Sequence, residues 1–212
     1  MSDTKQQLYE ALLAKKEWLK YNKLHTYSAY PYQWKFHSDK NKFRSLNCGN
    51  RPGKTFCGGS EMATHLTGKY PDDWEGRKFD HPILGLAGGK NNEKTRDLIQ
   101  KELFGDPADE KAWGTGWVPK ACIGKTVRKP GIPDAKYHVY VKHYTDGVYD
   151  GDSKLTLLAY DMGKESWMGF AADIVWLEIG RASCRERVKF SGGAGSERNE
   201  VTMREMEEAR IA

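Results

Sequence analysis

The sequence predicts an α/β protein with a mostly parallel β-sheet flanked by helices. A glycine-rich loop at 48–55 stands between a short apolar run and a segment compatible with a helix. Two further apolar runs, at 82–87 and 174–177, have the length and composition of buried strands. Strands that alternate with helices after such a loop indicate a parallel sheet covered by helices.

Composition limits the class of protein. The 212 residues suffice for one α/β domain with a core of its own. The net charge of +5 permits contact with a polyanion without requiring it. No apolar run reaches the length of a membrane span, and the N-terminal segment lacks the apolar stretch of a signal peptide. We therefore expect no membrane partner.

Cysteine and aromatic content indicate a packed protein from a reducing compartment. Aromatic residues make up 12% of the chain, too many for a disordered segment. The cysteines form no C-x-x-C pair and have no zinc-type spacing with histidine, so we interpret them as free thiols. They are Cys48, Cys57, Cys122 and Cys184.

The elements before residue 70 follow from apolar spacing. An amphipathic helix is predicted within 1–26, and we expect it to pack on the flank of the domain. The aromatic segment 27–37 is interrupted by proline and is typical of a loop or a short helix. A buried strand is predicted at 43–47, and a helix at 55–66 despite two glycines that weaken it.

The later elements are predicted in the same way. A strand at 82–87 precedes a helix that Asn91 or Asn92 would cap. The segment 105–133 is rich in loop residues, and we expect Trp113 and Trp117 to pack it down.

Two segments with period-two alternation follow this loop-rich stretch. They predict strands at 137–143 and 154–160, with a turn at 150–152 between them. The apolar run 174–177 is typical of a central parallel strand.

The loop Cys48-Gly49-Asn50-Arg51-Pro52-Gly53-Lys54-Thr55 resembles the phosphate-binding pattern G-x-x-x-x-G-K-[ST]. Backbone N–H groups at a helix N-terminus bind phosphate oxygens, Lys54 would reach the β/γ-phosphates, and Thr55 would hold Mg²⁺. The first position is Cys48 rather than glycine, and Pro52 removes one N–H donor. A second Gly-Lys-Thr at 124–126 precedes Val-Arg-Lys-Pro, which cannot open a helix.

A phosphate-loop NTPase also needs a carboxylate at the end of a neighbouring strand, to hold Mg²⁺. Glu178 follows the apolar run 174–177 and is our candidate for this role, although it could be an ordinary strand-end residue. Together the two motifs predict a P-loop NTPase fold that binds ATP and Mg²⁺, with Lys54 and Glu178 as catalytic residues and Thr55 and Glu178 as metal ligands.

The order of motifs resembles the N-terminal ATPase part of the large terminase subunit of tailed bacteriophages, over about residues 8–178. The phosphate loop has the variant form Gly-Asn-Arg-Pro-Gly-Lys-Thr at 49–55. The other matching motifs are Pro31-Tyr32-Gln33 with Phe36-His37, the run from His65 to Pro71 with Trp74, Thr95-Arg96-Asp97, Trp117-Val118-Pro119-Lys120, Glu165-Ser166-Trp167-Met168-Gly169 and Asp173-Ile174-Val175-Trp176-Leu177.

This resemblance implies roles for individual residues. Tyr32 and Gln33 would contact adenine, and Arg51 would sense or stabilise the γ-phosphate, where charge builds up during transfer. The alternative for Tyr32 and Gln33 is that they are loop residues covering the core. The implied nucleotide site consists of Tyr32, Gln33, Gly49, Asn50, Arg51, Pro52, Gly53, Lys54 and Thr55, and Arg51 joins the catalytic residues.

The resemblance also implies a biological role. It implies an ATPase that drives double-stranded DNA into a capsid, within the cytoplasm of the infected bacterial host. The partners implied are double-stranded DNA, a portal protein, a small terminase subunit and further copies of the chain in a ring. The parent protein would also be an endonuclease.

The chain departs from the family pattern at its second motif. The family usually has Asp-Glu after Trp-Leu, whereas this chain has Glu178-Ile179. Residues 179–188 match the translation of a common sequencing adapter, so we hypothesise that 179–212 is not natural continuation and that residue 178 is natively Asp. The alternative is a genuine basic loop followed by a charged helix at 197–210.

These observations divide the chain into an N-terminal helix (1–26), a partial P-loop ATPase domain (27–178) and a non-family tail (179–212). We expect the fold to be incomplete at its C-terminal end and the tail to pack weakly. Because the water-activating carboxylate is missing, we expect ATP binding with poor hydrolysis. Two other functions stay open: another P-loop NTPase, such as a helicase-like protein, and a non-catalytic nucleotide-binding fragment.

Overall fold

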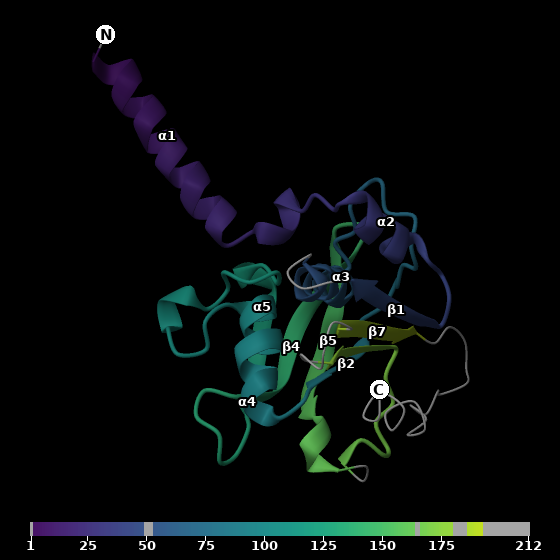
Figure 1. The fold of residues 1–212 in the computed structure, drawn as a ribbon. Helices are drawn as coiled ribbons and strands as arrows, with labels where there is room; N and C mark the ends of the chain where they lie inside the picture. Colours follow the sequence, from purple (N-terminus) through teal and green to yellow (C-terminus); the bar gives the residue numbers. More distant parts are fainter. Residues whose placement is uncertain (1, 49–52, 164–165, 180–185, 193–212) are drawn as a thin grey trace.

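The computed structural model describes residues 2–48, 53–163, 166–179 and 186–192. Figure 1 shows a central β-sheet with helices packed on it and a long N-terminal helix that leaves the body of the protein. The described strands form one seven-stranded sheet in the order β1-β7-β6-β2-β5-β4-β3. Their bounds are β1 Phe43–Cys48, β2 Leu84–Gly89, β3 Ile123–Arg128, β4 Lys136–Thr145, β5 Val148–Ala159, β6 Ile174–Ile179 and β7 Glu186–Gly192.

The α/β class is confirmed, but the prediction of a mostly parallel sheet is wrong. Strand β2 pairs in parallel with β5 and β6. The other described pairings, β1 with β7, β7 with β6, β5 with β4 and β4 with β3, are antiparallel. The two-residue turn between β4 and β5 makes these two strands antiparallel. On the other side of the sheet, β7 lies between β1 and β6 and runs antiparallel to both.

The turn between β4 and β5 is not at 150–152, where the sequence predicts it. It is at Asp146 and Gly147, which have φ angles of 51° and 80°, as a two-residue hairpin turn requires. Residues 150–152 lie inside β5, where Asp150 accepts hydrogen bonds from the His143 ring at 2.8 Å and the Thr145 hydroxyl at 2.6 Å. The loop-rich segment 105–133 also contains a strand that the prediction lacks, β3.

The helices of the core match the prediction closely. Helix α3 begins at Lys54, and the helical segment from 92 to 104 is capped by Asn91, whose side chain accepts from the Lys94 N–H at 2.8 Å. The helical elements are α1 Ser2–Lys20, η1 Lys23–Thr26, α2 Pro31–Ser38, α3 Lys54–Thr67, α4 Asn92–Lys94, the π-helical turn η2 Thr95–Gln100, α5 Lys101–Phe104, and the short 3₁₀ turns η3 Glu110–Ala112, η4 Lys120–Cys122 and η5 Tyr160–Met162.

Helix α1 forms as predicted but does not pack on the flank of the domain. Figure 1 shows it extending away from the sheet. Its apolar side chains are correspondingly open to solvent, with Leu8 61% and Leu12 56% exposed. The described part of the chain therefore leaves the apolar stripe of α1 uncovered. None of the described helices is both long enough and apolar enough to cross a membrane.

The sheet has a different cover on each face. Helices α2, α3 and α5 bury the larger core, which includes Trp117 and Trp176. The opposite face is covered by the segment that follows β5, where Trp167 packs on Leu86 and Leu158 of the sheet. Trp113 lies half-buried against the larger core, so both tryptophans predicted to pack the loop down do so.

Strand β7 belongs to the segment 179–212, which the sequence predicts to pack weakly. Its backbone pairs with β1 on one side and with β6 on the other. Backbone pairing therefore joins Glu186–Gly192 to the sheet, and weak packing of the tail stays a prediction. The helix considered for 197–210 lies outside the described residues.

Candidate nucleotide site

The structure describes the last three residues of the predicted phosphate loop, Gly53, Lys54 and Thr55, at the start of α3. Gly53 precedes the helix with φ 85° and ψ 33°, a left-handed conformation that favours glycine. Lys54 is the first helical residue and is only 4% exposed, and Thr55 is half-buried. The other predicted loop residues, Gly49, Asn50, Arg51 and Pro52, lie outside the described residues.

Strand β6 places Glu178 opposite the start of α3. The Thr55 hydroxyl donates a hydrogen bond to Glu178 Oε1 at 3.1 Å, and Glu178 is buried. Hydroxyl and carboxylate oxygens suit Mg²⁺, which is usually bound through one or two protein ligands together with waters and substrate phosphates. Within the described ranges, no cluster of three His, Cys, Asp or Glu side chains could hold a metal ion.

A glycine in α3 sets the distance between this helix and β6. A Cβ atom added at Gly58 would lie 2.7 Å from Cε2 of Trp176, closer than carbon atoms approach one another. Trp176 is fully buried. The two glycines in α3, which lower its intrinsic helix propensity, therefore allow close packing: Gly59 meets Trp117 in the same way.

Helix α2 brings the predicted adenine-binding residues to the phosphate loop. Gln33 is fully buried, and its Nε2 donates to the Gly53 carbonyl at 3.3 Å. Its Oε1 accepts from the Tyr30 N–H at 2.9 Å. Tyr32 is 38% exposed, and its ring stacks on Tyr30 with an interplanar angle of 7°. An amide offers two donors and two lone pairs, so Gln33 has capacity beyond these two bonds, while Tyr32 offers an exposed aromatic face.

A buried carboxylate connects α2, α3 and β1. Glu61 Oε2 lies 2.7 Å from His37 Nδ1 of α2, and Arg44 of β1 donates to Glu61 Oε1. His65 Nε2 lies 3.5 Å from the same Oε1, and His37 Nε2 lies 2.7 Å from the Tyr27 hydroxyl. We call these five residues the Glu61 cluster.

The cluster keeps Glu61 ionised. Burial alone raises the pKa of the Glu61 carboxyl, but hydrogen bonds from His37 and His65 and the positive charge of Arg44 outweigh burial and hold the pKa well below its ordinary value. Burial lowers the pKa of His65, which favours its neutral form. A neutral His65 donates to Glu61 through Nε2 and accepts from the Tyr70 hydroxyl, 3.1 Å from Nδ1.

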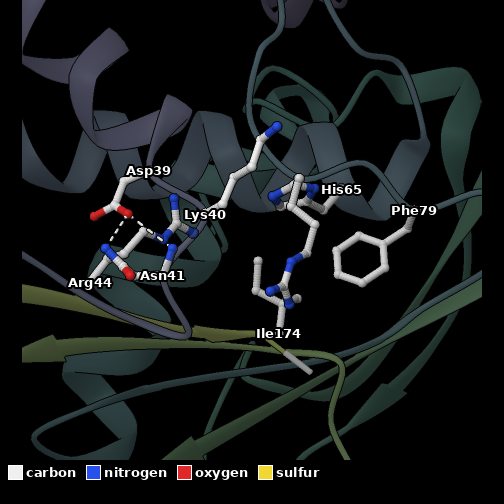
Figure 2. A pocket seen from close by; sticks show the side chains of 8 residues that line it. Asp39, Lys40, Asn41, Arg44, His65, Phe79 and Ile174 are labelled. Carbon is white, nitrogen blue, oxygen red and sulfur yellow. Dashed lines mark hydrogen bonds between the residues drawn. The ribbon is translucent and has the colours of Figure 1, made fainter. Parts of the chain in front are cut away.

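A pocket lies beside Ile174, where β6 begins (Figure 2). It has about 260 Å³ of empty space, including its open mouth. Its lining includes Ile174 at the start of β6, whereas Glu178 lies near the end of the same strand, roughly 13 Å further along at 3.3 Å per residue. This pocket is therefore separate from the Thr55–Glu178 pair. The full lining is Asp39, Lys40, Asn41, Arg44, His65, Arg77, Phe79 and Ile174.

Comparisons with known proteins identify the family of the chain. Residues 46–178 match the family model described as "Terminase large subunit, T4likevirus-type, N-terminal". The chain belongs to this terminase family. It is also 31% identical to the "Terminase, large subunit" of Salmonella phage P22 over 194 residues, which cover 84% of this chain. No solved structure matches the chain significantly.

The terminase match has two limits. The alignment spans 39% of the length of the P22 protein. The match to the family model ends at residue 178, and the predicted non-family tail begins at the next residue.

The sequence of this terminase chain identifies candidate site residues where they stand in a known motif, the phosphate-loop pattern or the carboxylate at a strand end. The structure brings Thr55 to Glu178, and Gln33 to Gly53, whereas the roles of these residues toward a nucleotide stay predictions. Sequence reasoning missed the role of Glu61, which has the appearance of an ordinary charged residue within a helix. The one signal that could have found it was a charged side chain at a position flanked by small and apolar neighbours, 57–63.

Proposed function

We propose that this chain is the ATP-binding part of a terminase motor that moves double-stranded DNA into a phage capsid. The observation that supports this most is the contact between the Thr55 hydroxyl and the Glu178 carboxylate at 3.1 Å. Two oxygen ligands, 123 residues apart in the sequence, meet at the N-terminus of the helix that follows the phosphate loop. The match to the terminase family supports the proposed role in phage DNA packaging.

The proposed site has a separate residue for each part of the nucleotide. Lys54 neutralises charge on the β- and γ-phosphates, and Arg51 stabilises the charge that develops during phosphoryl transfer. Thr55 and Glu178 would hold Mg²⁺, which would supply positive charge to the phosphates. Tyr32 stacks on the adenine, and Gln33 fixes the segment that contains it.

Turnover requires a group that orients the attacking water. The family pattern places this group in the residue after the metal-binding carboxylate, and Ile179 occupies that position here. An alkyl side chain cannot accept a proton or hydrogen-bond to water. We therefore propose that this chain binds Mg²⁺–ATP and hydrolyses it poorly.

Removal of the Lys54 charge tests nucleotide binding. We expect Lys54→Met to weaken Mg²⁺–ATP binding at least about tenfold, because a charge-assisted hydrogen bond contributes about 1.5–3 kcal/mol. The measurement is isothermal titration calorimetry on the 212-residue chain. Lys125→Met is the matched control, since Lys125 stands in the second Gly-Lys-Thr but lies in β3. Equal affinity in wild type and Lys54→Met would contradict nucleotide binding at Lys54. Steady-state turnover that Lys54→Ala abolishes would contradict poor hydrolysis.

The metal site has its own test. In wild type, we expect chelation of Mg²⁺ by EDTA to weaken ATP binding. Thr55→Val is nearly isosteric and removes the hydroxyl ligand, so its ATP affinity should be lower and should respond less to EDTA. Glu178→Gln should behave in the same way. A full EDTA response in both variants would show that Mg²⁺ binds elsewhere.

Partners follow from the proposed motor. We propose contacts with double-stranded DNA, a portal protein and a small terminase subunit, in a ring of copies within the infected host cell. Contacts to DNA phosphates would be independent of sequence and weakened by salt. Stimulation of ATPase activity by DNA in a full-length parent would separate this function from that of a phosphate-loop NTPase that does not need DNA.

A further inference from the structure

Helix α2 is attached to α3 at two points. The first is at the start of α3, where the Gln33 amide donates to the Gly53 carbonyl. The second lies about one turn further along α2 and about two turns into α3, where His37 meets Glu61 at 2.7 Å. His37 and Glu61 are each 1% exposed, so water does not compete for this bond.

The His37 ring is fixed on all sides. Both of its nitrogens have partners, Glu61 at Nδ1 and the Tyr27 hydroxyl at Nε2. The rings of Trp34 and Trp74 pack against it at centroid distances of 5.9 Å and 5.1 Å. The ring cannot turn without breaking a buried hydrogen bond, so it fixes α2 relative to Glu61.

We propose that His37 is a positioning residue for nucleotide binding: through Glu61 it holds α2 so that Tyr32 faces the base of a nucleotide bound at the phosphate loop. This inference rests on the proposed function. With both attachments α2 cannot rotate about either one. Without the His37 bond, α2 keeps the Gln33 attachment and a hydrogen bond from Arg44 of β1 to the Phe36 carbonyl at 2.9 Å. No direct bond then joins α2 to Glu61, so α2 and the stacked rings of Tyr30 and Tyr32 can shift relative to α3.

His65 is the matched comparison within the same cluster. It is as buried as His37 and also bonds Glu61, but it belongs to α3 itself. Its other nitrogen faces Tyr70 rather than α2. Loss of His65 therefore perturbs the same carboxylate without releasing α2. A purely structural role of the cluster predicts similar effects for both histidines, whereas positioning predicts an effect for His37 alone.

The test compares ATP with inorganic tripolyphosphate, which has the phosphate chain without the base. Calorimetry with Mg²⁺ on the full chain measures both affinities. We expect His37→Phe to lower the ratio of ATP affinity to tripolyphosphate affinity about tenfold, the loss typical of one interaction at the base, and to leave tripolyphosphate binding unchanged. His37→Gln, which can donate to Glu61 and accept from Tyr27, should restore most of the ratio. His65→Phe should leave the ratio at the wild-type value.

Each other outcome is decisive. An unchanged ratio in folded His37→Phe, or an equal loss in His65→Phe, overturns the inference. So does a wild-type chain that binds both ligands equally well, although that result leaves the phosphate site intact. Failure of the wild-type chain to bind either ligand removes the proposed function instead. If His37→Phe does not fold, His37→Met replaces it, because a flexible methionine adapts to the space and also removes the bond to Glu61: a lowered ratio supports the inference, and an unchanged ratio overturns it.

Discussion

Glu61→Gln is expected to lower the free energy of unfolding by about 3–5 kcal/mol, the loss measured when one partner is removed from a buried ion pair. The substitution keeps the volume of the side chain and removes its charge. Arg44, whose side chain is 9% exposed, then has a buried positive charge without its carboxylate. His37 and His65 lose an anionic acceptor at the same time. Urea unfolding followed by tryptophan fluorescence measures the difference.

The stability difference between wild type and Glu61→Gln is expected to depend on pH. The pKa of Glu61 is depressed in the folded protein, so the native state binds this proton less readily than the unfolded chain does. The stability that results is fully present above the unfolded pKa, about 4.3, and is lost as the pH falls below it. The difference in stability between wild type and Glu61→Gln should therefore narrow as the pH falls below about 4.3.

An exposed ion pair gives the control for this experiment. Lys101 and Asp106 lie 2.7 Å apart with side chains that are 54% and 39% exposed. Exposed pairs contribute little to stability, so Asp106→Asn should have no measurable effect. A loss below about 1 kcal/mol in Glu61→Gln, as for a surface pair, would mean that the cluster does not stabilise the fold as its burial indicates.

Local sequence signals predicted the elements that position the site. Strands β1 and β6 form where short strands are predicted, and α3 begins at Lys54, so composition and spacing suffice for their positions. The predicted burial holds for Ile174 to Leu177 of β6 but not for Phe43 of β1, which is 55% exposed. The contact between Glu178 and Thr55 has the arrangement expected of a carboxylate on a strand beside a phosphate loop, while the binding of Mg²⁺ there stays a prediction.

Features that depend on distant packing were not predictable in this way. Strand β3 has few apolar residues, and its pairing with β4 determines its conformation. Residues 150–152 have the composition of a turn, yet Gly151 is in a strand where Pro82 approaches it: an added Cβ would lie 2.8 Å from Pro82 Cγ. In the Glu61 cluster, only Glu61 and His65 have a local spacing, four residues apart on α3, and no local spacing relates them to His37 of α2 or Arg44 of β1.

Removal of the Trp176 side chain is the second change for which we expect a large effect. Trp176→Ala should cost about 3–5 kcal/mol, because it removes a fully buried indole and leaves a cavity. Gly58→Ala should cost about 1–3 kcal/mol in the wild-type background, since its Cβ would lie 2.7–3.0 Å from three ring atoms. Chemical denaturation of the purified variants measures both losses of stability.

The combination of the two changes tests the contact itself. Once the indole is gone, a methyl group at position 58 has space, and alanine is favoured over glycine in a helix by about 1 kcal/mol. Gly58→Ala should therefore stabilise the Trp176→Ala variant, although it destabilises wild type. Additive effects in the double variant would mean that the close approach of α3 to β6 does not limit the side chain at position 58.

This contact also affects the metal site. Trp176 and Glu178 are two residues apart on one strand and point to the same face, and Thr55 and Gly58 are about one helical turn apart on α3. The Gly58–Trp176 contact therefore lies directly beside the Thr55–Glu178 contact, and a side chain at position 58 that pushes α3 from β6 separates the two proposed Mg²⁺ ligands. We expect Gly58→Ala to weaken ATP binding with Mg²⁺ more than ATP binding in EDTA. Equal weakening under the two conditions would show that the spacing of α3 and β6 does not set the geometry of the metal site.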